Sequence, residues 1–464
     1  DIGTVDISNT TISGNEVQGS NGGGLFVGAG LTITLPSTVT VSGNTANGDG
    51  GGIYIDTGAD LTLDGAEVSN NTAGSIGGGI YGDTATLTLT NGALVDSNTA
   101  TSTAGGIQAT GGSVTVTNST VSNNTATTND GGGIHLAIGA VATVQNGSVV
   151  TGNDAGDEGG GIAVFDGSTL TVNNSSVTGN TAGTTGGGID NESTMTVEAA
   201  SYVGGNTAGS DGGGIYNETG ATLTVSGSTI DSNTVTLGDG GGIFNGGDLT
   251  LQSNTLVTDN TVDDGDGGGV YLDSTTSSVS ISDTLIAGNA VNGSDGGGLY
   301  NNGVTVVLPS TVSILNNSAT GNGGGIYNTN SGDLTLDGTT VGTVGNGNDA
   351  GSQGGGVWNG NNADLTLQNS ALIQGNNAAN GGGLYLDRTS GTVTLTSASI
   401  DQNTTDSNYG GGIYNDRLTL VIPNAVTLTD NSAVLQGGGL YNAEGDVTLD
   451  NTDVTGNSAG ASGD

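Results

Sequence analysis

The stretch Gly51–Gly79 reads GGIYIDTGADLTLDGAEVSNNTAGSIGGG and contains one full period of a repeat. Ile53 and Ile80 hold the same place in two consecutive periods, directly after a run of glycine. An aliphatic residue recurs at this place sixteen times: Leu25, Ile53, Ile80, Ile107, Ile134, Ile162, Ile189, Ile215, Ile243, Val270, Leu299, Ile326, Val357, Leu384, Ile413 and Leu440. The intervals between them average about 27.7 residues. A period of this length predicts a solenoid rather than several conventional domains.

Each period carries three short stretches in which apolar and polar residues alternate, as they do in a β-strand. In the quoted period they are Gly51–Ile55, Leu61–Leu63 and Val68–Ala73, separated by turns rich in Gly, Asn and Asp. No window shows the helical period of 3.6. Stacking such coils at ~4.8 Å pairs every strand with its copies in the next coils. The sequence therefore predicts an all-β fold, a right-handed parallel β-helix of about 16–17 coils of ~27 residues with three short strands per coil.

A column of Thr residues marks the middle of the second strand, as at Thr62. The three prolines of the chain each lie four residues after a Thr that we align with this column: Thr32 and Pro36, Thr305 and Pro309, and Thr419 and Pro423. This spacing predicts that each proline lies in the turn after the strand, where its missing N–H is harmless.

The third strand contains Asn at the same phase in nearly every coil. Nine of these residues form a continuous series: Asn44, Asn71, Asn98, Asn124, Asn153, Asn180, Asn206, Asn233 and Asn260. In the longest period the corresponding residue is either Asn346 or Asn348. Asn tolerates a left-handed bend, and stacked amides can hydrogen-bond along the axis. We therefore expect a structural Asn ladder.

The repeat fills the chain, which predicts one β-helix domain over residues 1–464 without separate caps. Asp1 is not preceded by Met or a leader, so we expect a mature or excised segment. Asp464 falls where the next run of glycine is due. Either the repeat tract is cut from a longer protein, or copies of the chain stack end to end through open strand edges.

The composition excludes several classes of partner. Arg388 and Arg417 are the only cations among 464 residues, against 44 carboxylates, and the formal net charge is −42. Such a chain cannot neutralise phosphates, so we expect no binding to nucleic acid or anionic lipid. No apolar run approaches the roughly 18 residues of a membrane span, so this segment is not expected to insert into a membrane. Without Cys, disulfides and thiolate–zinc sites are impossible.

The sequence Asn71-Thr72-Ala73, followed by Gly77-Gly78-Gly79-Ile80-Tyr81, resembles the repeat of polymorphic outer-membrane proteins. That repeat occurs in autotransporter passengers and other large bacterial surface proteins. Its pattern has Phe where this chain has Val or Ile, and Ala where this chain has Gly. The resemblance covers the whole chain and implies an exported β-helical rod, extracellular or on the cell surface and often adhesive.

The residue after the conserved aliphatic is expected to point outward. This column is aromatic through nine consecutive coils: Tyr216, Phe244, Tyr271, Tyr300, Tyr327, Trp358, Tyr385, Tyr414 and Tyr441. Stacked rings contribute about 0.5–1.5 kcal/mol per pair, so the column is either a stabilising ladder or a surface stripe that docks a partner. The same column contains Gln108, His135, Ala163 and Asp190. With no Cys and no second His, we expect no catalytic or metal role for His135.

Acidic residues concentrate just before the runs of glycine. Four of them occupy consecutive coils: Asp211, Asp239, Asp266 and Asp295. Like charges stacked about 5 Å apart cost on the order of 0.8 kcal/mol per pair in water. Calcium bound by these carboxylates would remove the cost, whereas solvated turn carboxylates would need no ion. The chain has no EF-hand loop and no Gly-Gly-x-Gly-x-Asp repeat. Calcium is therefore the one possible cofactor that the sequence raises.

The β-helix also hosts pectate-lyase-like enzymes, so the fold alone leaves function open. Those enzymes need converging acids and a basic residue, yet both arginines here follow an Asp and the coils vary only from 26 to 31 residues. We expect no enzymatic activity. The sequence favours a structural surface stalk or filament subunit that self-associates, end to end or side by side, or adheres to surface glycans. The alternative is a polysaccharide-binding or polysaccharide-cleaving β-helix.

Overall fold

The computed structural model describes residues 5–460, and every regular element in this range is a β-strand. The expectations drawn from Asp1 and Asp464 concern residues outside this range. Strands of successive coils pair in parallel and in register, so Leu61 lies opposite Leu87 and Leu63 opposite Leu89. The predicted parallel β-helix of about 17 coils of ~27 residues is confirmed.

One coil of the structure contains four short strands. In the quoted stretch they are β7 (Ile53–Ile55), β8 (Asp60–Asp64), β9 (Glu67–Ser69) and β10 (Thr72–Ala73). The third predicted strand is thus divided in two. The division falls at Asn70, whose φ of 56° lies in the left-handed region and turns the backbone between β9 and β10.

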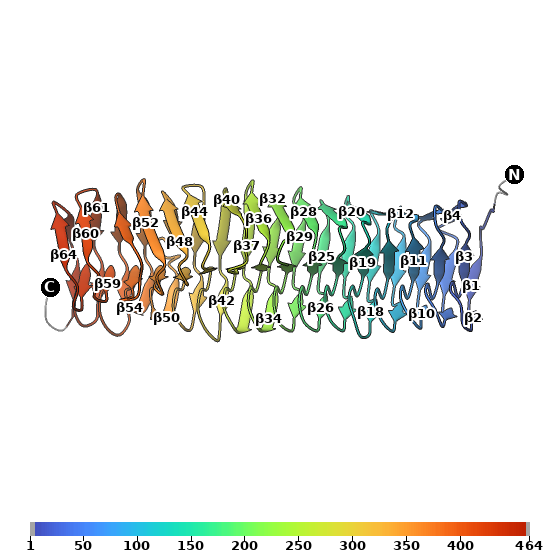
Figure 1. Cartoon of the computed structure of the whole chain (residues 1–464), viewed down its shortest axis with the longest axis horizontal. Helices are drawn as coiled ribbons and strands as arrows, with labels where there is room; N and C mark the ends of the chain where they lie inside the picture. The colour runs from blue at the N-terminus through green and yellow to red at the C-terminus, as the bar shows by residue number, and fades with distance from the viewer. Residues whose placement is uncertain (1–4, 461–464) are drawn as a thin grey trace. The chain divides into compact units, whose positions relative to one another are not determined.

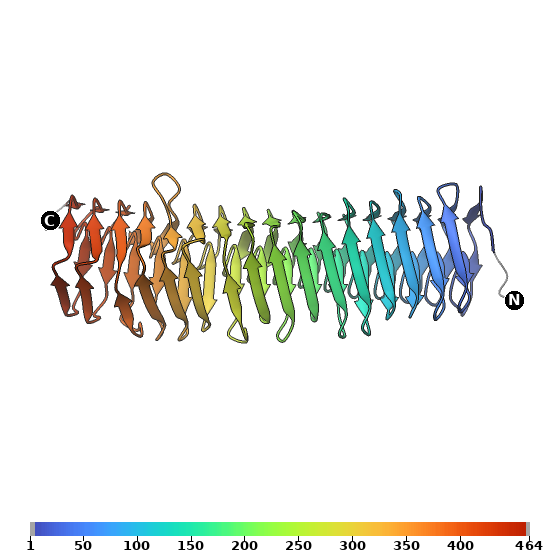
Figure 2. The same cartoon turned by 90° about the horizontal axis from the view of Figure 1, so that it is seen from above.

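The contacts of the chain divide into two compact units, unit 1 (Asp1–Thr234) and unit 2 (Val235–Asp464). Unit 2 repeats the same coil, as in β35 (Ile243–Asn245), β36 (Asp248–Gln252), β37 (Thr255–Thr258) and β38 (Thr261–Asp264). Within each unit the strands of one column follow one another side by side (Figure 1), and their arrows point the same way from coil to coil (Figure 2). The prediction of a single domain stays a prediction.

The core of each coil is filled by aliphatic side chains that alternate with outward-facing polar ones. In the coil of β7–β10 the buried aliphatic residues of the strands are Ile53, Ile55, Leu61, Leu63, Val68 and Ala73. Burial of each Leu, Ile or Val contributes about 1.5–3 kcal/mol. Because every coil offers the same side chains at the same places, the core continues from coil to coil within a unit.

The runs of glycine allow the backbone to approach the ladder of Asn side chains. A Cβ atom on Gly52 would lie 2.8 Å from Asn71 Nδ2 and 2.7 Å from the carbonyl oxygen of Gly79, closer than real contacts allow. Gly50 has a φ of 65°, which an L side chain rarely adopts. These two requirements explain why the motif is glycine at both places.

The three prolines lie at the ends of strands that open a sheet. Pro36 ends β4 (Thr32–Pro36), Pro309 ends β44 (Thr305–Pro309) and Pro423 ends β60 (Leu420–Pro423). In unit 2, β44 begins a separate four-stranded sheet and β60 a two-stranded one. Proline has no N–H to donate to a neighbouring strand, so it is tolerated on such edges.

The alignment of these three coils differs from the sequence prediction by two residues. Thr34, Val307 and Val421 lie opposite the Thr column, at Thr62, Thr335 and Thr448 respectively. The assignment of Thr32, Thr305 and Thr419 to that column is therefore wrong, and the prolines lie in the strands rather than in the turns. Among residues 5–460 there is no helix with the length and apolar character of a membrane span.

Candidate functional site

The Asn ladder is a continuous series of side-chain hydrogen bonds within each unit. Asn44 Nδ2 donates to Asn71 Oδ1 at 2.9 Å, and Asn71 Nδ2 donates to Asn98 Oδ1 at 2.9 Å. Each backbone N–H donates to the same oxygen, as from Asn44 to Asn71 at 3.0 Å. All nine predicted residues, from Asn44 to Asn260, are buried. The ladder satisfies these buried amides, each bond contributing about 0.5–1.5 kcal/mol net.

In unit 2 the series begins at Asn260, which donates to Asn289 Oδ1 at 2.9 Å. In the longest coil Asn348 is the member, because Asn317 Nδ2 donates to its Oδ1 at 2.9 Å. Asn346 instead closes a turn by donating its backbone N–H to the carbonyl oxygen of Thr343. The alternative that the sequence left open is thereby decided.

A second, discontinuous set of buried Asn residues was missed at the level of the sequence. Asn301 Nδ2 donates to Asn328 Oδ1 at 2.8 Å, and Asn328 Nδ2 donates to Asn359 Oδ1 at 2.6 Å. Asn191 and Asn217 form the same bond in unit 1 at 2.7 Å. The signal was the Asn two residues after the conserved aliphatic, as in the motif Gly-Gly-Gly-Ile-Tyr-Asn.

The aromatic column is a stack of rings. Its eight members from Phe244 to Tyr441 lie in unit 2. In six pairs of successive rings the centroids are 4.2 Å (Tyr327 and Trp358) to 5.1 Å apart. Tyr216 continues the column in unit 1, opposite Asp190 of the preceding coil. Tyr409, outside the predicted column, stacks on Tyr441 at 4.6 Å.

The rings are more enclosed than a surface stripe. Four of the nine are buried (Tyr271, Tyr327, Trp358 and Tyr385), and the other five are half-buried. Each ring covers the face of the next, which removes most of the apolar surface from water. Burial raises the pKa of Tyr271, Tyr300, Tyr327 and Tyr385 well above the usual range, so their hydroxyls are neutral.

The column of Asp residues accepts hydrogen bonds from the backbone of the following coil. Asp266 N–H donates to Asp239 Oδ1 at 2.8 Å, and Asp295 N–H donates to Asp266 Oδ1 at 2.9 Å. Asn322 continues the series by donating to Asp295 Oδ1 at 2.6 Å. Burial raises the pKa of Asp266 and Asp295. These carboxylates, with Asp211, therefore have partners in the protein, and calcium at this column stays a prediction.

Four successive coils of unit 1 carry other residues at the place of the aromatic column. We call them the polar break: Gln108, His135, Ala163 and Asp190, which lie opposite one another. Its three polar members are buried. Among residues 5–460, four buried polar side-chain atoms have no hydrogen-bond partner: Gln108 Oε1, His135 Nδ1, Asp190 Oδ1 and Asn322 Oδ1. Three of the four belong to the polar break. Such atoms are costly to bury, so the break is the most unusual place in the fold.

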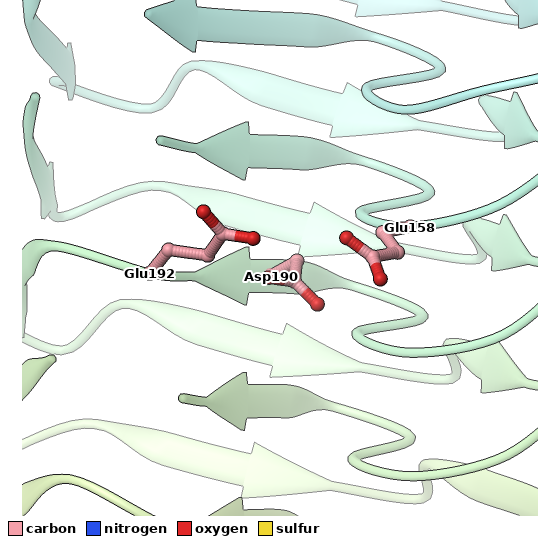
Figure 3. A group of neighbouring side chains, drawn as sticks. All are labelled: Glu158, Asp190 and Glu192. Atoms are coloured by element: carbon pink, nitrogen blue, oxygen red, sulfur yellow. The ribbon is translucent and has the colours of Figure 1, made fainter. Parts of the chain in front are cut away.

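Asp190 lies at the centre of an acidic cluster formed with Glu158 and Glu192. Asp190 is in β27 (Ile189–Asn191), Glu192 follows that strand, and Glu158 precedes the glycines that lead into β23 (Ile162–Val164). One carboxylate oxygen of each lies within 4.8 Å of the other two. Figure 3 shows the two glutamates on either side of Asp190.

The cluster holds more negative charge than its surroundings balance. Asp190 is 1% exposed, and Thr185 Oγ1 donates to its Oδ2 at 2.7 Å while Oδ1 has no partner. Burial, with the other carboxylates, holds the pKa of Asp190 well above its usual range. Burial followed by repulsion among the acids raises the pKa of Glu158 and of Glu192 to about 7. With only oxygen donors, the cluster can hold a hard cation or a proton.

His135 is a buried, neutral side chain. Its ring packs edge-on against Phe165, with centroids 5.1 Å apart. Burial lowers the pKa of His135 to about 4, so the imidazole is uncharged at pH 7. The absence of a catalytic or metal role for His135 stays a prediction.

Comparison with known proteins gives one family. The model described as "right handed beta helix region" matches residues 2–207, 90–256 and 160–341, which together span more than half of the chain. No curated protein and no solved structure matches the chain. The family description agrees with the predicted right-handed coil.

Proposed function

Because the chain belongs to the right-handed β-helix family, we propose that it is a non-enzymatic structural protein of the extracellular or cell-surface space. It serves as a stalk or filament subunit of the polymorphic outer-membrane or autotransporter-passenger type. The Asn ladder carries this proposal. In each unit the ladder repeats one hydrogen-bonded contact between neighbouring coils, as from Asn71 to Asn98 and from Asn289 to Asn317.

Such a ladder suits a mechanical role. A bond that recurs in every coil distributes load along the stack of coils, and each coil depends only on its neighbours. Most buried side chains of the repeat are aliphatic residues of the core or Asn residues of these ladders. The excess of carboxylates keeps such molecules soluble and repels nonspecific partners.

The partners in this proposal are further copies of the chain, end to end or side by side, and surface glycans. The half-buried rings of Tyr300, Tyr414 and Tyr441 support the second kind of contact. A sugar ring packs on the edge of an aromatic stack while the hydroxyl groups offer hydrogen bonds. No nucleic acid or membrane is involved.

Electron microscopy of the purified chain tests the structural role. We expect filaments or bundles longer than one subunit, and monodisperse particles of single-subunit length at every concentration would contradict self-association. A triple change at Tyr271, Tyr300 and Tyr327 to Phe keeps the rings and removes only the hydroxyls. Loss of binding on a glycan array with assembly intact would assign the stripe to glycans. Loss of assembly would assign it to self-association.

The acidic cluster favours the alternative, a polysaccharide-cleaving β-helix. Its carboxylate oxygens lie within 4.8 Å of one another, close to the about 5–5.5 Å between the two acids of retaining glycosidases. Release of reducing ends from acidic or neutral glycans, abolished by Glu158→Gln, would support this alternative. We expect no such release, because Asp190, at the centre of the cluster, is 1% exposed and is not accessible to a sugar ring.

A further inference from the structure

The acidic cluster contains a buried carboxylate oxygen that no protein group satisfies. Asp190 Oδ1 has no hydrogen-bond partner, and the side chain is buried between Glu158 and Glu192. Its other oxygen is already engaged by Thr185. A carboxylate buried in this way requires a positive charge or a proton to offset its desolvation.

The surrounding sequence supplies no such charge. Unit 1 contains neither Lys nor Arg, since both arginines of the chain, Arg388 and Arg417, lie in unit 2. The imidazole of His135 is uncharged at pH 7. Further carboxylates, Asp130, Asp166 and Glu218, act on the cluster and increase its negative potential. A cation that compensates this charge can therefore come only from solution.

We propose that Glu158, Asp190 and Glu192 bind one divalent cation, and that this cation is calcium. All three donors are carboxylate oxygens, the ligand type that hard cations prefer and that zinc, copper or iron–sulfur sites do not use alone. Calcium accepts irregular coordination by six to eight oxygens, some of them water. Magnesium demands a near-ideal octahedron, which two side chains from the end of β27 and one from the turn before β23 do not impose.

The position of the cluster gives the cation a route from solvent. Glu192 is exposed, Glu158 is half-buried and Asp190 is buried, so the three donors lead from the surface inward. Water molecules complete the coordination on the exposed side. The Asp column lacks this arrangement, because in that column the backbone N–H groups of the next coil satisfy the carboxylates of Asp239, Asp266 and Asp295.

Terbium luminescence tests the site directly. Tyr216 lies opposite Asp190 in the next coil, and Asp190 and Glu158 both act on the phenol, so a terbium ion in the cluster accepts energy from that ring. We expect terbium emission on excitation of tyrosine, displaced by calcium at one ion per chain. Tyr216→Phe should lose most of the emission yet keep calcium binding in calorimetry.

Variants distinguish calcium binding at this cluster from nonspecific binding to the other carboxylates of the chain. Glu192→Gln, at the exposed end, should weaken calcium binding about tenfold or more, since calcium affinity follows the number of charged ligands. Asp190→Asn, of equal size, should abolish one-to-one binding. Asp266→Asn is the matched control and should bind calcium as the parent does. Calorimetry over about 10 μM to 10 mM calcium covers the range of extracellular sites.

Two results would overturn the proposal. One is the absence of a one-to-one calcium isotherm in the parent chain with its circular dichroism intact. The other is binding that Glu192→Gln and Asp190→Asn leave unchanged while Asp266→Asn removes it, which would place calcium in the Asp column. Should Asp190→Asn fail to fold, Glu192→Gln alone decides, because its side chain is exposed. Filament formation plays no part in these readouts, so they stand apart from the structural role proposed above.

Discussion

The backbone N–H of Asp266 donates to the Oδ1 of Asp239 in the preceding coil, at 2.8 Å. A residue of the acidic column thus uses its side chain as an acceptor for the next coil and its backbone as a donor to the previous one. The column that looks like a row of repelling charges is also a row of hydrogen bonds. The acceptor oxygens of Asp239, Asp266 and Asp295 belong to carboxylates; Asn322 donates its backbone N–H to Asp295, but its own Oδ1 accepts no hydrogen bond.

In this column, removal of a hydrogen-bond acceptor should therefore reduce the free energy of unfolding more than removal of a negative charge alone. Asp266→Ala leaves the N–H of Asp295 without its partner, and we expect a loss of about 1–3 kcal/mol in the free energy of unfolding. Asp266→Asn keeps an oxygen at the same place and should change stability by less than about 0.5 kcal/mol. Urea unfolding followed by circular dichroism measures both. Equal losses in the two variants would contradict the role of the acceptor.

Truncation within the Asn ladder should be among the most damaging single changes. Asn98→Ala removes the acceptor of Asn71 and the donor to Asn124 and to the carbonyl oxygen of Val68. Several buried groups then lack partners, so we expect a loss of about 3 kcal/mol or more. Hydrogen exchange of the neighbouring coils measures it. Asn70→Gly, at an exposed residue with a φ of 56°, is the control and should be nearly neutral.

Replacement of a buried ring should expose its neighbours in the stack. Tyr327→Ala opens a gap between Tyr300 and Trp358, whose centroids lie 4.9 Å and 4.2 Å from that of Tyr327. We expect a loss of about 3–5 kcal/mol, as for other buried aromatic residues. Trp358 is the only Trp, so its fluorescence should shift to the red and become accessible to iodide. Phe26→Ala, at a ring that is 52% exposed, should cost much less.

Acid should reduce the contribution of His135 to the stability of unit 1. Burial lowers the pKa of this side chain from 6.5 to about 4, so the unfolded chain takes up the proton first. The stability that neutral His135 contributes is complete above pH 6.5 and is lost as the pH falls toward 4, by about 3 kcal/mol in total. Glu158 and Glu192 act in the opposite direction. Their pKa values are raised from 4.5 to about 7, so the stability that they contribute is complete below pH 4.5 and is lost as the pH rises to about 7.

The variant His135→Phe isolates the first effect, because it keeps a ring against Phe165 and removes the titration. The difference in unfolding free energy between the parent and this variant should change between pH 6.5 and pH 4 and be flat above pH 7. A difference that does not depend on pH would show that the imidazole is not the sensitive group.

Much of the fold follows from the period of the sequence. Two features that recur in each period indicate how the coils stack: the aliphatic residue, as at Ile53 and Ile80, and the Asn of the Asn-Thr-Ala motif. Parallel strands in register place both the aliphatic residues and the Asn residues of successive coils opposite one another. The sequence alignment placed the three coils that contain proline two residues away from their register in the structure. A shift of two restores the same face of a strand, so apolar–polar alternation cannot detect it.

The acidic cluster was not predicted. Glu158 and Asp190 are 32 positions apart in the sequence, and only the stacking of coils and the directions of the side chains bring them together. The available signal was an Asp in a column that is aromatic in most coils, followed two residues later by Glu192. The enclosure of the aromatic rings was also beyond the sequence, because exposure depends on how closely successive rings cover one another.

The register of the conserved aliphatic column has a consequence for inheritance. Ile53, Ile80 and Ile107 lie directly opposite one another in successive coils. The contact surface between the first and second of these coils is therefore the same as the surface between the second and third. Loss or duplication of about 27 residues would join surfaces that already match. Genes of this kind can lengthen or shorten their product by recombination in whole steps, and each new length inherits a complete set of contacts.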